Sequence, residues 1–191
     1  MKALALLAVA PIDSSEQRKA AAAVGDLAAF ELLIRQYERL VLVTALRLLG
    51  NMADAQDVSQ EVFLRLYRNL GKLESQNLSG WLYRVTVNAS HDLRRKRPAT
   101  DPMEFASDVP AAGNDPQQSA TEAERRRVLE MSLRMLSEKE RAALVLRDLQ
   151  GLSTQDVAQA LGSSEATVRS QVSKARVKVK DFMERYFRRR I

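Results

Sequence analysis

Apolar residues recur at every third or fourth position along most of this chain, and no segment alternates apolar and polar residues as a half-buried strand does. The pattern predicts an all-α fold. Capping residues and glycines indicate where the helices start and stop, and Asp54 is expected to cap a third helix, which ends near Leu70. The expected helices begin at or just after Asp26, Asp54, Trp81, Ala123, Ser137, Ser153 and either Ser163 or Ser164.

These helices fall into two groups, separated by a segment of different composition. Residues 98–122 contain four of the five prolines and no basic side chain, so they cannot bury enough apolar surface to fold alone. We therefore expect an N-terminal tail at 1–13, a helical domain at 14–97, a flexible linker at 98–122 and a second helical domain at 123–191.

The segment from residue 149 to residue 180 predicts a helix-turn-helix. Ser153 suits the start of a short helix and Gly162 suits its left-handed end. The following helix carries apolar residues at the i, i+4, i+7 and i+11 positions Val168, Val172, Ala175 and Val179. Its other side carries donors suited to phosphates and base edges, namely Arg169, Ser170, Ser173 and Lys174. The alternative is an ordinary helical hairpin with a solvated basic face.

Charge is unevenly distributed along the 191 residues, whose formal net charge is +6. Residues 1–97 hold 14 Lys and Arg against 10 Asp and Glu, residues 98–122 hold none against 5, and residues 123–191 hold 16 against 9. Two basic lobes joined by an acidic linker favour a nucleic-acid partner, with salt-sensitive binding.

The composition excludes several functional classes. Because the chain has no cysteine and one histidine, His91, it cannot form disulfides, thiolate zinc sites or histidine clusters, and we expect no metal and no cofactor. The sequence shows no nucleophile–base pair and no phosphate loop, so we do not expect the chain to be an enzyme. A structural or adaptor role would need an exposed apolar surface, which sequence cannot locate.

The N-terminal residues 1–12 are similar to an export signal, but Pro11 interrupts the apolar run and no small-residue cleavage site follows. No other segment reaches transmembrane length. We expect a cytoplasmic protein without membrane insertion.

Three motifs in order resemble the extracytoplasmic-function (ECF) sigma factors of bacterial RNA polymerase. DAQDVSQEVFLRLYRNL (54–70) is similar to the family's polymerase-clamp helix, and SGWLYRVTVNASHDLRRKR (79–97) to its promoter-melting and −10 helix. Residues 136–176 resemble its −35 reader. The resemblance implies a sigma region 2 domain, a region 4 helix-turn-helix domain, and a linker through the RNA exit path.

On the first motif, the resemblance implies contact with the polymerase through Asp54, Asp57, Gln60 and Glu61. The last three lie at i, i+3 and i+4, opposite Val58 and Val62, and form an acidic-polar stripe suited to a basic partner helix. Two alternatives stay open: the aspartates simply cap the helix and complement its dipole, or the carboxylates hold a metal, although no histidine ligand supports that site.

On the second motif, the resemblance implies contact with the −10 element through Arg84, Asn88, Arg94, Arg95, Lys96 and Arg97. An asparagine can read a base edge, and in this family a base of the displaced strand is flipped into a protein pocket. The alternatives are plain helix polarity for Asn88 and a solvated tail for the basic run. Trp81 is interpreted as a core residue rather than a stacking platform.

On the third motif, the resemblance implies −35 contacts by Arg169, Ser170, Ser173 and Lys174, with phosphate contacts by Arg176 and Lys178. Gln171, Ser173, Glu165 and Ala166 depart from the residues usual in the family, so the −35 sequence is open.

We therefore interpret the chain as an ECF-type sigma factor, a specificity subunit without catalysis. Its implied partners are core RNA polymerase (clamp and flap regions), promoter DNA (duplex −35 and single-stranded −10) and an anti-sigma factor. The rival is a helix-turn-helix transcriptional regulator that binds operator DNA without being a polymerase subunit.

Overall fold

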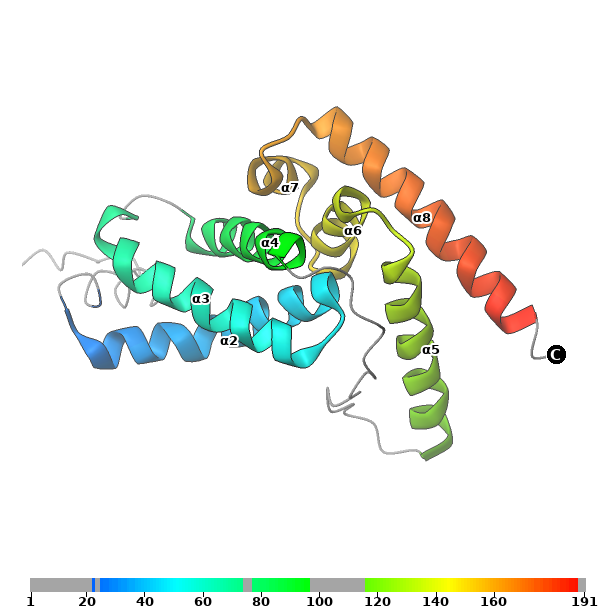
Figure 1. The fold of residues 1–191 in the computed structure, drawn as a ribbon, viewed down its shortest axis with the longest axis horizontal. Coiled ribbons are helices and arrows are strands. Elements are labelled where there is room, and N and C mark those ends of the chain that lie inside the picture. The colour runs from blue at the N-terminus through cyan, green and yellow to red at the C-terminus, as the bar shows by residue number, and fades with distance from the viewer. Residues whose placement is uncertain (1–21, 23–24, 74–76, 97–115, 189–191) are drawn as a thin grey trace, which may run out of the picture.

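The computed structural model describes residues 22, 25–73, 77–96 and 116–188. Every regular element in these ranges is helical, as the sequence predicted (Figure 1). The elements are α2 (Leu27–Leu49), α3 (Met52–Asn69), the 3₁₀ turn η1 (Leu70–Lys72), α4 (Leu78–Lys96), α5 (Pro116–Arg134), α6 (Glu138–Leu144), the π turn η2 (Val145–Leu149), α7 (Thr154–Leu161) and α8 (Glu165–Arg188).

The first group of helices, α2, α3 and α4, packs around one apolar core. Asp26 caps α2, as expected, by accepting from the backbone N–H groups of Ala28 and Ala29. Gly50 ends α2 in the left-handed region at φ 84°, which a glycine adopts without strain. The core contains Leu33, Val41, Val62, Leu66 and Leu82, all fully buried.

The prediction that Asp54 caps α3 was wrong. The cap is Asn51, whose Oδ1 accepts from the N–H of Asp54 at 2.7 Å, while its amide donates to the Asp54 carboxylate. Asparagine and aspartate both cap helices well. Because the chain turns at Gly50, Asn51 is the first capping residue after the turn and takes the position. Asp54 instead lies in the first turn, where its charge complements the helix dipole.

Two other boundaries differ from the predicted ones. α4 begins at Leu78 rather than Trp81, because the amide oxygen of Asn77 accepts from the N–H of Gly80 and so holds the first turn. α5 begins at Pro116, inside the segment expected to be linker, and proline is tolerated at the first helical position because no helical partner exists there for its missing N–H. The rest of the expected linker and the tail at 1–13 lie outside the described residues.

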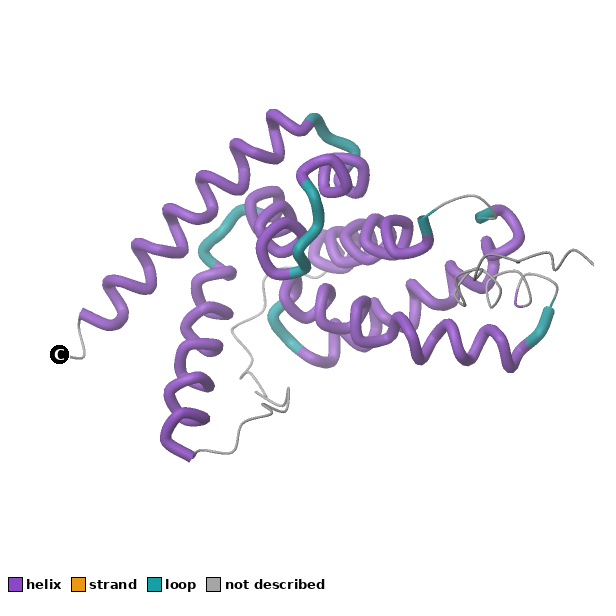
Figure 2. Tube along the Cα trace, turned by 180° about the vertical axis from the view of Figure 1, so that it is seen from behind, coloured by secondary structure: helices purple, strands orange, loops and turns teal. Residues whose placement is uncertain are grey.

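The second group comprises α5 to α8, in which α5 and α8 extend away from the α6–α7 end and contact each other (Figures 1 and 2). The predicted capping box is present: Glu140 N–H donates to Ser137 Oγ, and Ser137 N–H donates to the Glu140 carboxylate. The helix that follows ends in a π turn, in which Gln150 N–H bonds to Val145 O.

The two groups pack directly against each other. α4 lies against α7, and both views place it between the α2–α3 pair and the helix-turn-helix (Figures 1 and 2). The core of the second group also encloses three side chains of the first group, Leu48, Tyr83 and Val87. No local pattern in the sequence predicts this contact.

Candidate nucleic-acid interface

The exposed face of α8 carries the four side chains predicted to read DNA. Arg169, Ser170, Ser173 and Lys174 are all exposed, while Val168, Val172 and Ala175 on the other side are buried. Arg169 donates to the Glu165 carboxylate at 3.1 Å, an exposed pair that a phosphate or base can displace at little cost. The helix therefore presents a row of hydrogen-bond donors outward.

Local sequence signals fix the position of α8. Ser153 Oγ accepts from Asp156 N–H to start α7, and Gly162 ends it at φ 58°. Ser164, one of the two predicted caps, then accepts from Thr167 N–H at 3.1 Å to start α8. This glycine turn between two capped helices is the helix-turn-helix arrangement that the sequence predicted.

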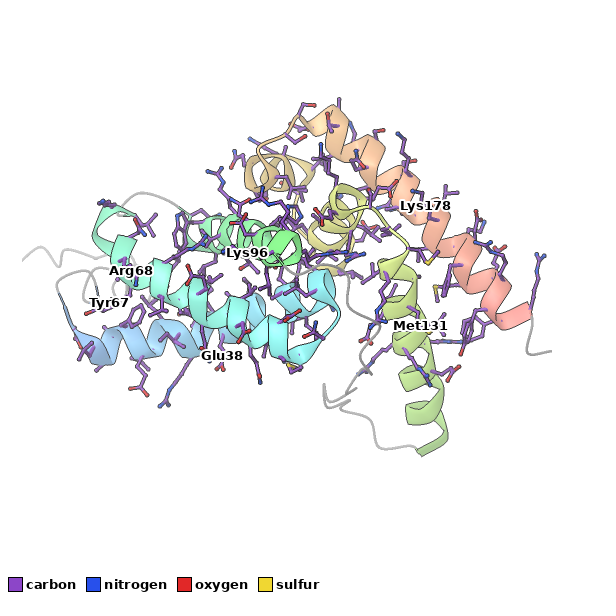
Figure 3. The ribbon with its side chains drawn as sticks, in the orientation of Figure 1. Glu38, Tyr67, Arg68, Lys96, Met131 and Lys178 are labelled. Atoms are coloured by element: carbon purple, nitrogen blue, oxygen red, sulfur yellow. The ribbon has the colours of Figure 1, made fainter. Side chains whose placement is uncertain are left out.

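The two predicted phosphate contacts have intramolecular partners. Arg176 forms a bidentate pair with Asp148, at 2.7 and 2.8 Å, which raises the pKa of Arg176 through its hydrogen bonds. Lys178, midway along α8 (Figure 3), donates to both carboxylate oxygens of Glu140 at 2.8 Å. Both cations thus fix α8 to the preceding helices.

Two further side chains belong to this surface. A notch beside α8 is lined by Arg147 and Thr154 together with Arg169, Ser173 and Arg176. Arg147 donates to Leu152 O at 3.0 Å, so its guanidinium is held at the turn before α7. Its signal in the sequence is a basic residue that precedes the turn at Gly151.

On α4, the residues predicted to contact the −10 strand divide into two sets. Asn88, Arg95 and Lys96 are exposed, and Arg95 donates to Asp92 at 2.8 Å. Arg84 is also exposed but donates to Gln159 O of α7 at 2.7 Å, and the half-buried Arg94 lies 3.6 Å from the Glu138 carboxylate of α6. Trp81 is partly buried against the first core, in line with a packing role, and Arg97 lies outside the described residues.

The stripe predicted on α3 is present opposite the buried Val58 and Val62. Asp57 and Gln60 are exposed, and Glu61 pairs with Arg65 at 2.7 Å. Within the described ranges no three His, Cys, Asp or Glu side chains are grouped so as to hold a metal ion.

The described helices include none with the length and apolar character needed to cross a bilayer.

A buried arginine, Arg141, joins the two groups of helices and was missed by sequence reasoning. It is 4% exposed and donates to Leu48 O at 2.8 Å, Leu133 O at 2.7 Å, Arg134 O at 3.1 Å and Leu136 O at 3.2 Å. Leu48 lies in the last turn of α2 and Leu133 in the last turn of α5, so the guanidinium donates to carbonyls at the C-terminal ends of two helices.

Electrostatics at this junction follow from burial. Burial lowers the pKa of Arg141 to about 10, which leaves it charged at neutral pH. Burial also lowers the pKa of His91 and raises that of Glu130, both of which lie beside arginines at the same contact. In the described structure His91 Nε2 is buried and makes no hydrogen bond. The junction thus includes one buried, charged guanidinium that donates to carbonyl groups.

Comparison with known proteins matches both helical groups. The sequence profile "Sigma-70 region 2" matches residues 33–100, and "Sigma-70, region 4" matches residues 126–179. ECF RNA polymerase sigma factor SigE of Mycolicibacterium smegmatis is 34% identical over 86% of this chain and 66% of its own length. The RNA polymerase sigma-H factor of Pseudomonas aeruginosa is 32% identical over 80% of this chain and 84% of its own length.

Solved structures give the same fold. The structure of CnrH in complex with the cytosolic domain of CnrY matches with a TM-score of 0.67 and 25% identity, over 90% of this chain and 98% of that one. The sigma factor RpoE in complex with the anti-sigma factor NepR, from Bartonella quintana, matches in fold with a TM-score of 0.66 and 23% identity, over 81% and 96%.

Proposed function

Because the chain belongs to the ECF family of RNA polymerase sigma factors, we propose that its α8 reads the −35 element and its α4 contacts the −10 strand of the promoters to which it directs core polymerase. One observation supports this most directly: α8 presents Arg169, Ser170, Ser173 and Lys174 outward while its opposite side is buried. Sigma factors are transcription initiation factors, and we infer no catalysis by this chain.

The residue roles follow from exposure and chemistry. We assign direct base or phosphate contacts to the four exposed residues of α8, and give Arg147 a phosphate contact at the notch. On α4, Asn88 is the candidate base reader because its amide offers both a donor and an acceptor. Arg84, Arg94, Arg95, Lys96 and Arg97 supply charge for the same strand.

Partners are proposed on the same basis. Asp57 and Gln60 lie exposed on α3 and suit a basic helix of the polymerase clamp, with Asp54 and Glu61 at the edge of that surface. An anti-sigma factor is a further expected partner, since the sigma factor RpoE of Bartonella quintana, which shares this fold, was solved in complex with the anti-sigma factor NepR. These partners imply a cytoplasmic site of action.

A reconstituted transcription assay tests the proposal. Purified chain and core RNA polymerase are incubated with a pool of upstream regions from the source genome, and start sites are sequenced. We expect defined start sites only when the chain is present. The Asn88→Ala and Arg169→Ala variants should lose these start sites. Arg35→Ala is a matched control, because Arg35 is an exposed arginine of α2 in a local pair with Glu31.

The rival function makes the opposite prediction. A regulator that is not a polymerase subunit would bind duplex operator DNA tightly alone and would produce no start sites with core polymerase. That result would overturn the proposal.

A further inference from the structure

Glu165, the first residue of α8, brings a negative charge to the surface assigned to duplex DNA. It lies one turn before Arg169, so the two side chains share the exposed face of the helix. The helix does not need Glu165 as a cap, because Ser164 Oγ accepts from the Thr167 N–H at 3.1 Å. The charge complements the helix dipole, but the same charge repels the phosphates of bound DNA. A carboxylate at this position therefore needs a role beyond the start of the helix.

Glu165 holds one end of the Arg169 guanidinium. Arg169 Nη1 donates to Glu165 Oε2 at 3.1 Å, and the two side chains are 63% and 49% exposed. A guanidinium is planar and carries five N–H donors, of which those on its Nε–Nη2 edge form a parallel pair. A bond through Nη1 leaves this edge free, and the edge bonds to no acceptor in the part of the chain that the structure describes. Arg169 is thus held at one end and offers a fork of donors at the other.

Arg176, which lines the same notch beside α8, shows the opposite arrangement. Its Nε and Nη2 donate to the two carboxylate oxygens of Asp148 at 2.8 and 2.7 Å, so its parallel donors are occupied. Arg176 has to leave Asp148 before it can bind DNA with this fork. Arg169 can bind DNA with its fork and keep its bond to Glu165.

Guanine is the base that matches the free edge of Arg169. In the major groove guanine presents O6 and N7, both acceptors, whereas adenine presents an acceptor beside a donor. On a phosphate or another base, Arg169 either leaves one donor unused or turns away from Glu165. The exposed ion pair is itself weak, but its loss leaves an unpaired carboxylate beside the phosphates of DNA. Glu165 therefore disfavours the wrong contacts more than it strengthens the right one.

We propose that Glu165 is a positioning residue for −35 recognition, which orients the Nε–Nη2 edge of Arg169 toward a guanine. It narrows the choice of base at one position of the element and adds no affinity of its own. This role rests on the function proposed above, because it requires that α8 reads the −35 duplex.

A selection with the holoenzyme tests this role. One promoter found in the start-site assay is randomised over its −35 element, the full chain and core polymerase bind the pool, and the bound duplexes are sequenced. The wild type should favour guanine by about five-fold or more at one position, and Arg169→Ala should abolish that preference. Glu165→Ala should lower the preference about two- to five-fold, the range that an exposed pair supports.

Affinities for two single promoters distinguish positioning from a structural role. The holoenzyme is titrated with duplexes that carry guanine or adenine at the selected position. In Glu165→Ala the adenine duplex should bind more tightly and the guanine duplex should bind as before, because the substitution removes a repulsive charge and keeps Arg169. A variant that merely failed to start α8 would bind both duplexes more weakly.

Two carboxylates serve as matched controls. Glu31 forms the same i,i+4 pair with Arg35 on α2, and Glu184 is an exposed carboxylate near the other end of α8. Glu31→Ala should leave both affinities unchanged. Glu184→Ala should change the two affinities by the same factor, so it should leave the base preference as it is.

The possible results separate the role of Glu165 from the proposed function. The role is overturned if Glu165→Ala keeps the full guanine preference, if it weakens both duplexes alike, or if Arg169 selects a base other than guanine. In each of these cases α8 still reads the −35 element. If no position of the element depends on Arg169, the reading assigned to α8 fails, and the role of Glu165 fails with it.

Discussion

Lys178 of α8 donates to both carboxylate oxygens of Glu140 on α6, at 2.8 Å each, and the Ser137 N–H donates to the same carboxylate at 3.0 Å. The Glu140 side chain is 7% exposed, whereas that of Lys178 is 50% exposed. The carboxylate that completes a capping box therefore also holds the recognition helix in place. The hydrogen bond from Lys178, followed by that from Ser137, lowers the pKa of Glu140.

Glu140→Gln should destabilise the second group of helices at neutral pH. The variant loses charge-assisted bonds, at a cost of about 1–3 kcal/mol. Because the folded pKa is depressed, the contribution of Glu140 is complete above the pKa of an unfolded glutamate, about 4.3, and is lost as pH falls through the folded value. Urea unfolding at pH 7 and at pH 3 measures both effects.

Glu184→Gln is the control for that experiment, since Glu184 is an exposed α8 carboxylate paired with Lys180 and Arg188. It should change stability little at either pH. If the wild type and Glu140→Gln lost stability in parallel on acidification, the role given to Glu140 would be wrong.

Asp148→Asn should strengthen duplex DNA binding. The substitution removes the charge that holds Arg176 in its bidentate pair, and so makes the guanidinium available to a phosphate. One added phosphate contact steepens the slope of log affinity against log salt by about 0.9. A titration by fluorescence anisotropy between 50 and 200 mM salt, concentrations at which such dependence is resolved, measures that slope.

The control is Asp181→Asn, which removes the same charge from an exposed position farther along α8. It should raise affinity less and leave the slope unchanged. Equal slopes for the two variants would mean that Arg176 stays fixed whether or not Asp148 is charged.

His91 should make stability pH-dependent near pH 6. Burial lowers its folded pKa, so the unfolded chain binds a proton first and stability falls as pH drops below about 6.5. Above that pH both states are neutral and the contribution is constant. Since His91 is the sole histidine, the urea midpoint of the His91→Gln variant should change less between pH 7.5 and pH 5.5 than that of the wild type. An unchanged pH profile in that variant would assign the dependence to other groups.

Short-range signals predicted most of the fold. Ser137 with Glu140, Ser153 and Gly162 act within four residues of themselves, and each performs the predicted role. Asn51 displaced Asp54 as a cap because both satisfy the same rule and only the turn at Gly50 decides between them.

Long-range pairings could not be predicted in this way. Arg141 lies 93 residues from Leu48, and Arg176 lies 28 residues from Asp148. In sequence Arg141 looks like an ordinary polar residue of a capped helix, and Arg176 like an exposed cation. Arg141 becomes a buried donor because one group of helices packs on the other. The Asp148 carboxylate reaches Arg176 because the chain turns at Gly151.

The α3 surface gives the prediction that separates polymerase binding from DNA binding. Asp57→Asn combined with Gln60→Ala should weaken binding to core RNA polymerase by about 1 kcal/mol, the upper range for an exposed charged contact. The helix itself should survive, because the buried Val58 and Val62 lie on its other side. Binding is measured by competition with a labelled wild-type chain for core polymerase. Glu38→Gln, at an exposed position on the neighbouring α2 (Figure 3), is the matched acidic control and should compete as the wild type does. Duplex DNA binding by α8 should be equal in all three proteins, since none of these substitutions touches it. Undiminished competition by the double variant would remove the stripe from the polymerase contact and leave its charges to the helix dipole alone.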